Sequence, residues 1–137
     1  GWIREGDAFT TDRDVSGIAV MPGDTRDGAV RLTYLLRDSK GIVINARDRK
    51  TDNTDASREL YVVQDHGNQL TIRLGRAGVD KVLTRMDVPA SIPKDAPRTL
   101  EFRVVGDTLT ATLNGSIIAT AKDATIPTGN FALVALK

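Results

Sequence analysis

The chain has 137 residues, of which 40% are hydrophobic and 27% are charged, as expected for one soluble globular domain spanning residues 1–137. Its 19 Lys and Arg residues and 18 Asp and Glu residues leave a formal charge of +1, which argues against nucleic acid or an anionic membrane as the main partner. The absence of cysteine excludes disulfides, thiolate metal sites and cysteine nucleophiles. No apolar run reaches the roughly 18 residues of a membrane span. We therefore predict no cofactor and no membrane-spanning segment.

Short segments in which apolar and polar residues alternate are the main feature of the chain. The alternation runs through residues 30–37, 100–105 and 109–113, so one set of side chains is expected to face a core and the other an open sheet face. Further strands are expected where Val, Ile, Leu and Thr gather, at 42–47, 60–65, 69–75, 79–84, 116–121 and 130–136. The period of two is that of β-strands, and no internal repeat divides the chain.

Glycine and asparagine mark tight turns between some of these strands. Asn114-Gly115 tolerates the positive φ angles of a type I′ hairpin, and Gly106-Asp107 forms a second short connection. The last third is therefore predicted to be a meander of strands over 98–105, 108–113 and 116–121, followed by a return at 130–136.

Two longer connections complete the pattern. Residues 48–58 are almost entirely polar and predict a solvated loop, and residues 87–97 carry three prolines that favour an extended connector. A single helical turn is expected within 54–62. Many short strands joined by hairpins, with two longer crossings, predict an all-β fold: a two-sheet antiparallel β-sandwich of the jelly-roll type.

Several segments, taken in order, share a pattern with one known superfamily. Residues 98–115 (RTLEFRVVGDTLTATLNG) form a strand pair with a Gly-Asp turn and an Asn-Gly end, and residues 129–134 (GNFALV) form a last strand with a Gly-aromatic start. Residues 2–9 match a first strand, 41–47 (GIVINAR) a central strand and 60–65 (LYVVQD) the strand that follows. In this order the segments resemble the concanavalin A-like lectin and glucanase superfamily, which includes laminin-G domains. The similarity is greatest to bacterial 3-keto-disaccharide hydrolase-type domains of largely unknown function. The resemblance implies a concanavalin A-like sandwich, a fold that serves lectins, hydrolases and adhesion modules alike.

Paired carboxylates of the glucanase type are absent from the sequence. Retaining glucanases need two carboxyl groups roughly 5 Å apart, whereas Glu5, Glu59 and Glu101 are widely separated. His66 beside Asp65 could serve as a general base, but its place in a turn predicts a surface residue. We therefore assign no catalytic residue and keep Glu59, Asp65 or Glu101 as the acid or base of an enzymatic alternative.

Arginines within predicted strands indicate a polar face. Arg31 and Arg73 alternate with core residues, and Arg47 shares its face with Asn45. If these strands are neighbours in one sheet, the guanidinium groups suit sugar hydroxyls, carboxylates or sulfates, and Tyr61 is the best candidate to stack on a sugar. We therefore predict a ligand-binding site of Arg47, Asn45, Tyr61, Arg73 and Arg31. The alternative is an ordinary solvated sheet face on which arginines pair with acidic residues.

Most of the remaining aromatic residues are expected in the core. Phe9, Phe102 and Phe131 lie in the apolar phase of their strands. Tyr34 is expected in the core with its hydroxyl at an edge, and Trp2 is expected to cover one end of the sandwich.

The polar loop supplies hard oxygen ligands of the kind that calcium prefers. Asp48, Asp52, Asn53 and Asp55 lie close together, but the spacing lacks the bidentate glutamate of an EF-hand. We assign no metal ligands, and calcium binding by residues 48–55 stays an open alternative.

These observations and the resemblance together predict a non-catalytic binding module, most simply a carbohydrate-binding one, within a larger bacterial protein, with a glycan or an anionic ligand as its partner. Two alternatives stay open: a glycoside hydrolase of the 3-keto-disaccharide type, and a structural domain that docks a protein partner. Nothing in the sequence indicates the compartment.

Overall fold

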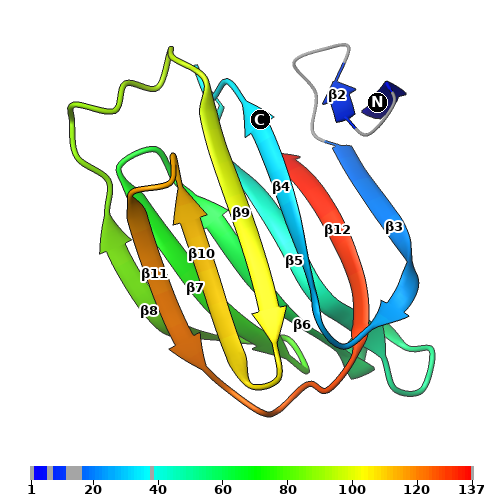
Figure 1. Cartoon of the computed structure of the whole chain (residues 1–137). Helices are drawn as coiled ribbons and strands as arrows, with labels where there is room; N and C mark the ends of the chain where they lie inside the picture. The colour runs from blue at the N-terminus through cyan, green and yellow to red at the C-terminus, as the bar shows by residue number, and fades with distance from the viewer. Residues whose placement is uncertain (1, 6–7, 12–16, 38, 137) are drawn as a thin grey trace.

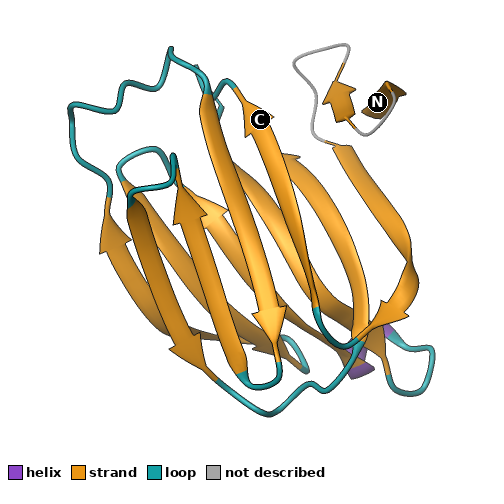
Figure 2. Cartoon of the chain, in the orientation of Figure 1, coloured by secondary structure: helices purple, strands orange, loops and turns teal. Residues whose placement is uncertain are grey.

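The computed structural model describes residues 2–5, 8–11, 17–37 and 39–136, which form strands, turns and one short 3-10 helix (Figure 2). The elements in chain order are β1 (Trp2–Glu5), β2 (Ala8–Thr11), β3 (Gly17–Thr25), β4 (Gly28–Tyr34), β5 (Gly41–Lys50), η1 (Asp55–Ser57), β6 (Arg58–Asp65), β7 (Gln69–Arg76), β8 (Val79–Asp87), β9 (Arg98–Val105), β10 (Thr108–Leu113), β11 (Ile117–Lys122) and β12 (Gly129–Leu136). Within these described segments, no helix has the length and apolar character needed to cross a membrane.

The strands form a two-layer antiparallel sandwich, so the predicted fold class is confirmed. One layer is a four-stranded sheet in the order β11-β10-β9-β4, and the other is a six-stranded sheet in the order β3-β12-β5-β6-β7-β8. Figure 1 shows the four-stranded sheet in front of the six-stranded one. The edge strands β8 and β11 lie side by side along one margin of the sandwich. Strands β1 and β2 pair with each other in a separate ribbon.

The predicted meander of β9, β10 and β11 is confirmed, with each strand paired to the next. Asn114 and Gly115 have φ angles of 52° and 72°, as the type I′ turn between β10 and β11 requires. Strand β12 does not extend this meander but crosses to the other sheet, where it pairs with β3 and β5. It is apolar on both faces because it occupies a central position there, with Phe131 and Leu133 in the core.

Alternate residues of both sheets build the core between them. Strand β9 shows the pattern clearly, because Leu100, Phe102 and Val104 are buried while the residues between them are not. Phe102 and Phe131 are core residues as predicted, and Tyr34 packs against the core. The side chains of Trp2 and Phe9 lie outside what the structure describes.

The strands differ from the predicted ones at several points; β8, for example, continues to Asp87, beyond the predicted 79–84, and β4 ends at Tyr34. Strand β5 continues to Lys50, so the predicted loop over 48–58 begins only at residue 51. Strand β3 has no counterpart among the predicted strands. The single helical turn expected after Thr54 is present as η1.

Candidate ligand-binding site

The five predicted ligand residues do not lie on one face, so that part of the prediction is wrong. Arg31 is on the outer face of the four-stranded sheet, whereas Asn45 and Arg73 are on the outer face of the six-stranded sheet. The side chains of Arg47 and Tyr61 are buried inside the sandwich, with 3% and 0% of each residue exposed. Alternation along a strand assigns its two faces but does not say which sheet holds the strand.

A β-bulge explains the position of Arg47. The pairing of β5 with β6 shifts between Ala46 and Arg49, which gives β5 one residue too many on that side. Arg47 lies in this bulge with a φ angle of 48°, in the left-handed region. The bulge turns its side chain off the outer face and toward one end of the sandwich.

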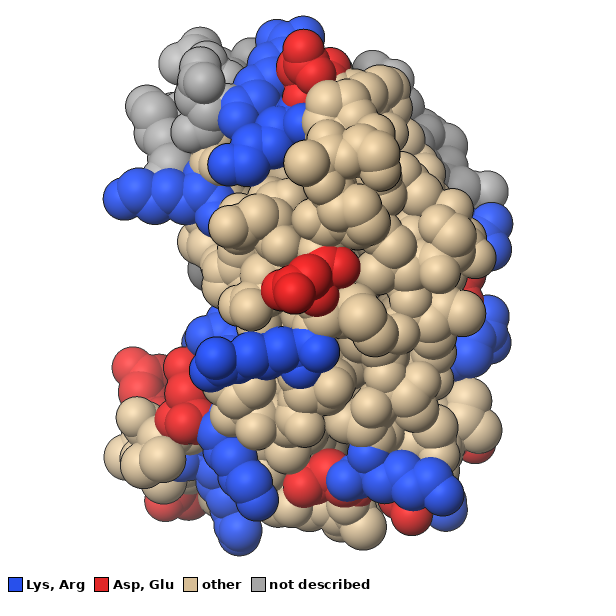
Figure 3. Space-filling model, turned by 90° about the vertical axis from the view of Figure 1, so that its left-hand side faces the viewer, with Lys and Arg blue, Asp and Glu red and all other residues tan. Residues whose placement is uncertain are grey.

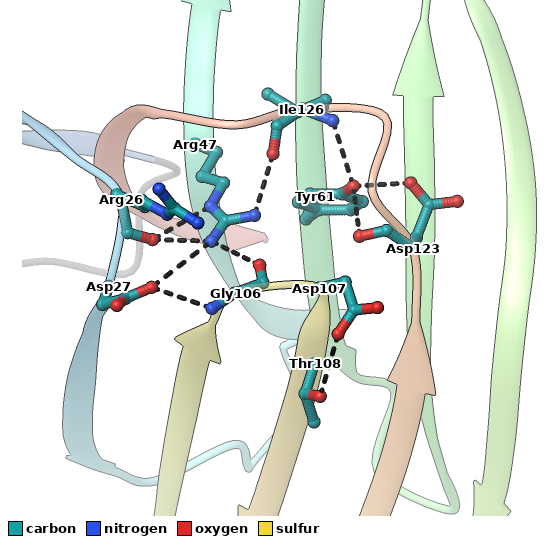
Figure 4. Close-up of polar contacts among 9 residues, drawn as sticks. All are labelled: Arg26, Asp27, Arg47, Tyr61, Gly106, Asp107, Thr108, Asp123 and Ile126. Carbon is teal, nitrogen blue, oxygen red and sulfur yellow. Dashed lines mark hydrogen bonds and ion pairs between the residues drawn. The ribbon is translucent and has the colours of Figure 1, made fainter.

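At this end the Arg47 guanidinium forms hydrogen bonds to three loops, those between β3 and β4, between β9 and β10 and between β11 and β12 (Figure 4). Its Nε and Nη2 donate to the Arg26 carbonyl oxygen at 3.0 and 2.7 Å, and Nη2 also donates to that of Gly106 at 2.7 Å. Its Nη1 donates to the Ile126 carbonyl oxygen at 2.8 Å. Burial lowers the pKa of Arg47, and the Asp27 carboxylate at 3.8 Å counteracts that effect. Each of the three guanidinium nitrogens donates to a backbone carbonyl oxygen of the fold, which makes Arg47 a structural residue.

Tyr61 completes the same end of the molecule. Its hydroxyl lies 2.5 Å from Asp123 Oδ1 and accepts a hydrogen bond from the Ile126 amide at 3.2 Å. Burial raises the pKa of this hydroxyl to about 12. A fully buried ring cannot stack on a sugar.

An open hollow of about 400 Å³, here called the end pocket, lies beside Arg47 and is lined in part by Arg26, Gly106 and Ile126.

The outer side of β5, β6 and β7 forms what we call the concave face. Its residues are Val43, Asn45, Val62, Gln64, Thr71 and Arg73. Asn45, Val62 and Arg73 form one row across the three strands, and Val43, Gln64 and Thr71 form the next.

Burial and shape both set this face apart. Apart from Arg73, its residues are at most 8% exposed although no core covers them, while Arg103 and Val105 on the outer side of β9 are exposed. Figure 3 shows the molecule hollowed on the side of the six-stranded sheet, with charged side chains on the margins of the hollow. The curvature crowds the side chains of this face together.

The polar groups of the concave face contact one another. Arg73 Nη2 donates to Gln64 Oε1 at 2.7 Å, and Arg73 Nη1 lies 3.4 Å from the Asp80 carboxylate. Arg73 Nε is buried and has no hydrogen-bond partner within the described part of the chain. At the end of β6, His66 Nε2 lies 2.9 Å from Thr71 Oγ1.

His66 is held in its neutral form. Burial and the nearby Arg73 guanidinium lower its pKa below the ordinary 6.5, while Asp65 acts in the opposite direction. At pH 7 its imidazole therefore has one donor and one acceptor nitrogen at the margin of the concave face, and Nε2 is the one that contacts Thr71. Sequence reasoning placed His66 in a turn and missed its contact with β7.

Ion pairs cover the outer face of the four-stranded sheet. Arg31 and Arg103 contact the two oxygens of Glu101 at 2.8 and 3.1 Å, and they hold the pKa of that carboxyl below its ordinary value. The Arg31 side chain is 71% exposed. Such exposed pairs contribute about 0–1 kcal/mol each. This arrangement is the solvated sheet face that we considered as the alternative.

Sequence reasoning also missed a buried network at the opposite end of the sandwich. Arg98 Nη1 donates to both oxygens of Asp65 at 3.0 Å, and the Tyr34 hydroxyl donates to Asp65 Oδ2 at 2.7 Å. Asp65 and Arg98 are 0% and 1% exposed. Burial and the Asp65 carboxylate raise the pKa of Tyr34. Asp65 belongs to the six-stranded sheet and the other two to the four-stranded sheet, so the network joins the layers.

The acidic residues of the 48–55 loop are engaged in local contacts. Asp48 pairs with Arg58 and Asp55 pairs with Lys50, both at 2.7 Å, and Asp52 accepts hydrogen bonds from Thr54. Among the described residues, no group of three or more His, Asp or Glu side chains could hold a metal ion.

No protein-family model matches the chain, and no curated protein sequence matches it either. Its structure is similar to that of the carbohydrate-binding module CBM66 from Bacillus subtilis, with a TM-score of 0.71 and 16% identity over 99% of this chain and 83% of that one. It is similar to sheep galectin-11 in complex with glycerol, with a TM-score of 0.61 and 14% identity over 93% and 96% of the two chains. It is also similar to a β-glucanase from Bacillus licheniformis, with a TM-score of 0.57 and 15% identity over 84% and 55%. The chain therefore has the concanavalin A-like jelly-roll fold found in lectins and glucanases.

Proposed function

We propose that the chain is a non-catalytic carbohydrate-binding module within a larger bacterial protein, and that the sugar lies on the concave face. The observation that carries the proposal is the set of closely packed polar side chains on β5, β6 and β7: Asn45, Gln64, Thr71 and Arg73, in rows that each also hold a valine. An amide at Asn45, a guanidinium at Arg73 and a neutral imidazole at His66 together supply both donors and acceptors. Sugar hydroxyls, which donate and accept, are complementary to such a set.

Arg73 is the anchor of the proposed site. A buried donor without a partner costs about 1–3 kcal/mol, and Arg73 Nε is such a donor. An acceptor oxygen of a bound ligand would remove this cost. Asn45 lies in the same row, two strands away, and is the second contact that we propose.

The proposed site keeps two of the five residues predicted from the sequence, Asn45 and Arg73. It adds Gln64, Thr71 and His66, and it leaves out the three whose side chains lie elsewhere. No Phe, Tyr or Trp is among the concave-face residues, so little aromatic surface is available to desolvate a sugar. We therefore expect a dissociation constant of about 0.1–1 mM, or roughly 4–5.5 kcal/mol of binding free energy.

A glycan array followed by calorimetry on the bound glycan tests the proposal. Arg73→Ala and Asn45→Ala should each weaken binding about tenfold or more, since a hydrogen bond to a charged or buried group is lost. Arg103→Ala is the matched control, because this arginine is exposed on the opposite sheet. Unchanged affinity in both concave-face variants, or a loss in Arg103→Ala, would place the site elsewhere.

The resemblance to 3-keto-disaccharide hydrolase-type domains keeps hydrolysis as the competing proposal. Glycoside hydrolysis needs a free pair of carboxyl groups. Glu59 is bound to Arg49 at 2.6 Å, Asp65 is buried against Arg98, and Glu101 lies between two arginines. We therefore favour binding. Incubation with the array-selected glycan, followed by chromatography, should release no product.

A further inference from the structure

Strand β8 exposes both its backbone edge and apolar side chains. Among the described strands it is the last one of the six-stranded sheet and pairs only with β7. Val79, Val82 and Met86 on this strand are 68%, 40% and 39% exposed. Figure 3 views this margin of the sandwich and shows a broad uncharged area crossed by few charged side chains. An unpaired edge strand presents a row of N–H and C=O groups that another strand can pair with.

We propose that β8 pairs antiparallel with β8 of a second copy of this chain about a two-fold axis. The pairing joins the two six-stranded sheets into one continuous sheet. It covers the exposed apolar side chains of both copies and pairs the free backbone edge of each.

The faces of β8 restrict how two copies can align. Arg73 pairs with Val82 and Ile72 pairs with Thr84, so Leu83 is an extra residue and a bulge. The core-facing side of β8 therefore carries Val79 and Lys81 before the bulge and Thr84 and Met86 after it. The concave side carries Asp80 and Val82 before it and Arg85 and Asp87 after it. Directly opposite residues in a sheet must point to the same face.

Two alignments satisfy this rule outside the bulge at Leu83, and the residues that they bring together decide between them. The favoured one places Val79 opposite Met86 and Asp80 opposite Arg85, and the symmetry forms each pair twice. The first pair is an apolar contact between exposed side chains, and the second joins opposite charges. Sliding one copy toward the far end brings Asp80 opposite Asp87, which is repulsive. Charges on an edge strand commonly prevent pairing, but those of β8 are complementary to themselves.

The dimer has a consequence that rests on the proposed function. A two-fold axis perpendicular to the shared sheet turns both concave faces to the same side. Two sites on one surface bind a polysaccharide with a higher apparent affinity than either site alone. Isolated disaccharides gain nothing from the second site.

Sedimentation velocity of the full chain over a hundredfold range of concentration measures the association. The unmodified chain should show the mass of two chains at high concentration. Arg85→Asp places like charges opposite each other and should raise the dimer dissociation constant at least tenfold. The double variant Asp80→Arg/Arg85→Asp should restore the dimer by exchanging the two charges. Arg103→Asp on the opposite sheet is the control and should leave the association unchanged.

The register is tested by cross-linking, because the chain has no cysteine of its own. Opposite residues in an antiparallel pair have Cα atoms about 4.5–5.5 Å apart, within the range that a disulfide spans. Val79→Cys/Met86→Cys should therefore form a covalent dimer on oxidation, while either single variant should stay monomeric on a non-reducing gel. In this register Val79 of one chain lies far from Val79 of the other, and the same holds for the two Met86 residues, so a single cysteine has no partner within reach.

Three results would overturn the proposal: a single-chain mass at every concentration, a dimer that tolerates Arg85→Asp, or a double-cysteine variant that does not cross-link. Calorimetry with a disaccharide distinguishes a failure of the dimer proposal from a failure of the proposed function. A monomeric chain that still binds the sugar refutes the dimer alone, and a dimer that binds no sugar refutes the function alone.

Discussion

Replacing Arg47 with methionine tests whether this residue holds the fold together or contacts a ligand. The change removes four hydrogen bonds to the carbonyl oxygens of Arg26, Gly106 and Ile126, while the methionine fills much of the space of the arginine stem. The bond to Ile126 is buried and should contribute about 2 kcal/mol. The bonds to Arg26 and Gly106 are only partly buried, so water can replace part of their loss, at about 0.5–1 kcal/mol for each carbonyl. We expect the free energy of unfolding to fall by about 3–4 kcal/mol.

Urea and thermal unfolding followed by far-UV circular dichroism measure this loss. For a domain of this size about 3–4 °C is lost per kcal/mol, so Tm should fall by about 10 °C. Arg31→Met is the matched control, because its side chain is 71% exposed and the change should cost about 0.5 kcal/mol or less. A loss below about 1 kcal/mol in Arg47→Met would refute the structural role. Loss of sugar binding at unchanged stability would return Arg47 to the ligand site.

Three further predictions follow from the buried network, the histidine and a close backbone approach. Asp65→Asn and Arg98→Met should each lower the free energy of unfolding by about 3–5 kcal/mol because the remaining partner is left buried, and a double-mutant cycle should show a total below the sum. The depressed pKa of His66 means that the unfolded chain binds its proton more readily, so stability should fall as pH drops below 6.5 and level off below the folded pKa. His66→Gln should remove this component in urea titrations between about pH 5 and 7, and an identical slope would contradict the assignment. Gly129→Ala should cost about 2–3 kcal/mol in the same assay, because its Cβ would lie closer than 3.0 Å to the backbone of Arg47; an unchanged midpoint would contradict the packing.

The sequence predicts the fold well because its local signals agree with the final arrangement. Alternation in β9 and β10 gives the buried face of each strand, and Asn114-Gly115 gives the hairpin that follows. These features depend only on residues close together in the chain. The crossing of β12 to the other sheet depends on which strands lack a neighbour, and that information is spread over the whole chain.

The site is less predictable for two physical reasons. Arg31 and Arg73 both alternate with core residues, but their strands belong to different layers, which no single strand reveals. A bulge then reverses the expected direction of Arg47, because one additional residue moves every following side chain to the other face. The run Leu60 to Val63 is apolar in both phases, so it gives no direction for Tyr61. In hindsight such a run indicates a strand that is buried on both sides.

The two buried arginines, Arg47 and Arg98, stabilise the fold independently of the concave face, so the residues of that face can change without loss of the fold. Arg98 joins the layers at one end of β9, and Arg47 bonds to Gly106, just beyond the other end. Both act between the layers, whereas Arg73 bonds to Gln64 within one sheet. The contributions to stability and to binding should therefore separate. Arg73→Ala should lower the affinity for the sugar at a cost in stability below about 1 kcal/mol, whereas Arg47→Met should lower the stability and leave the affinity unchanged. If Arg73→Ala unfolds the chain as readily as Arg47→Met, the concave face is itself part of the support, and its polar groups need no ligand to explain them.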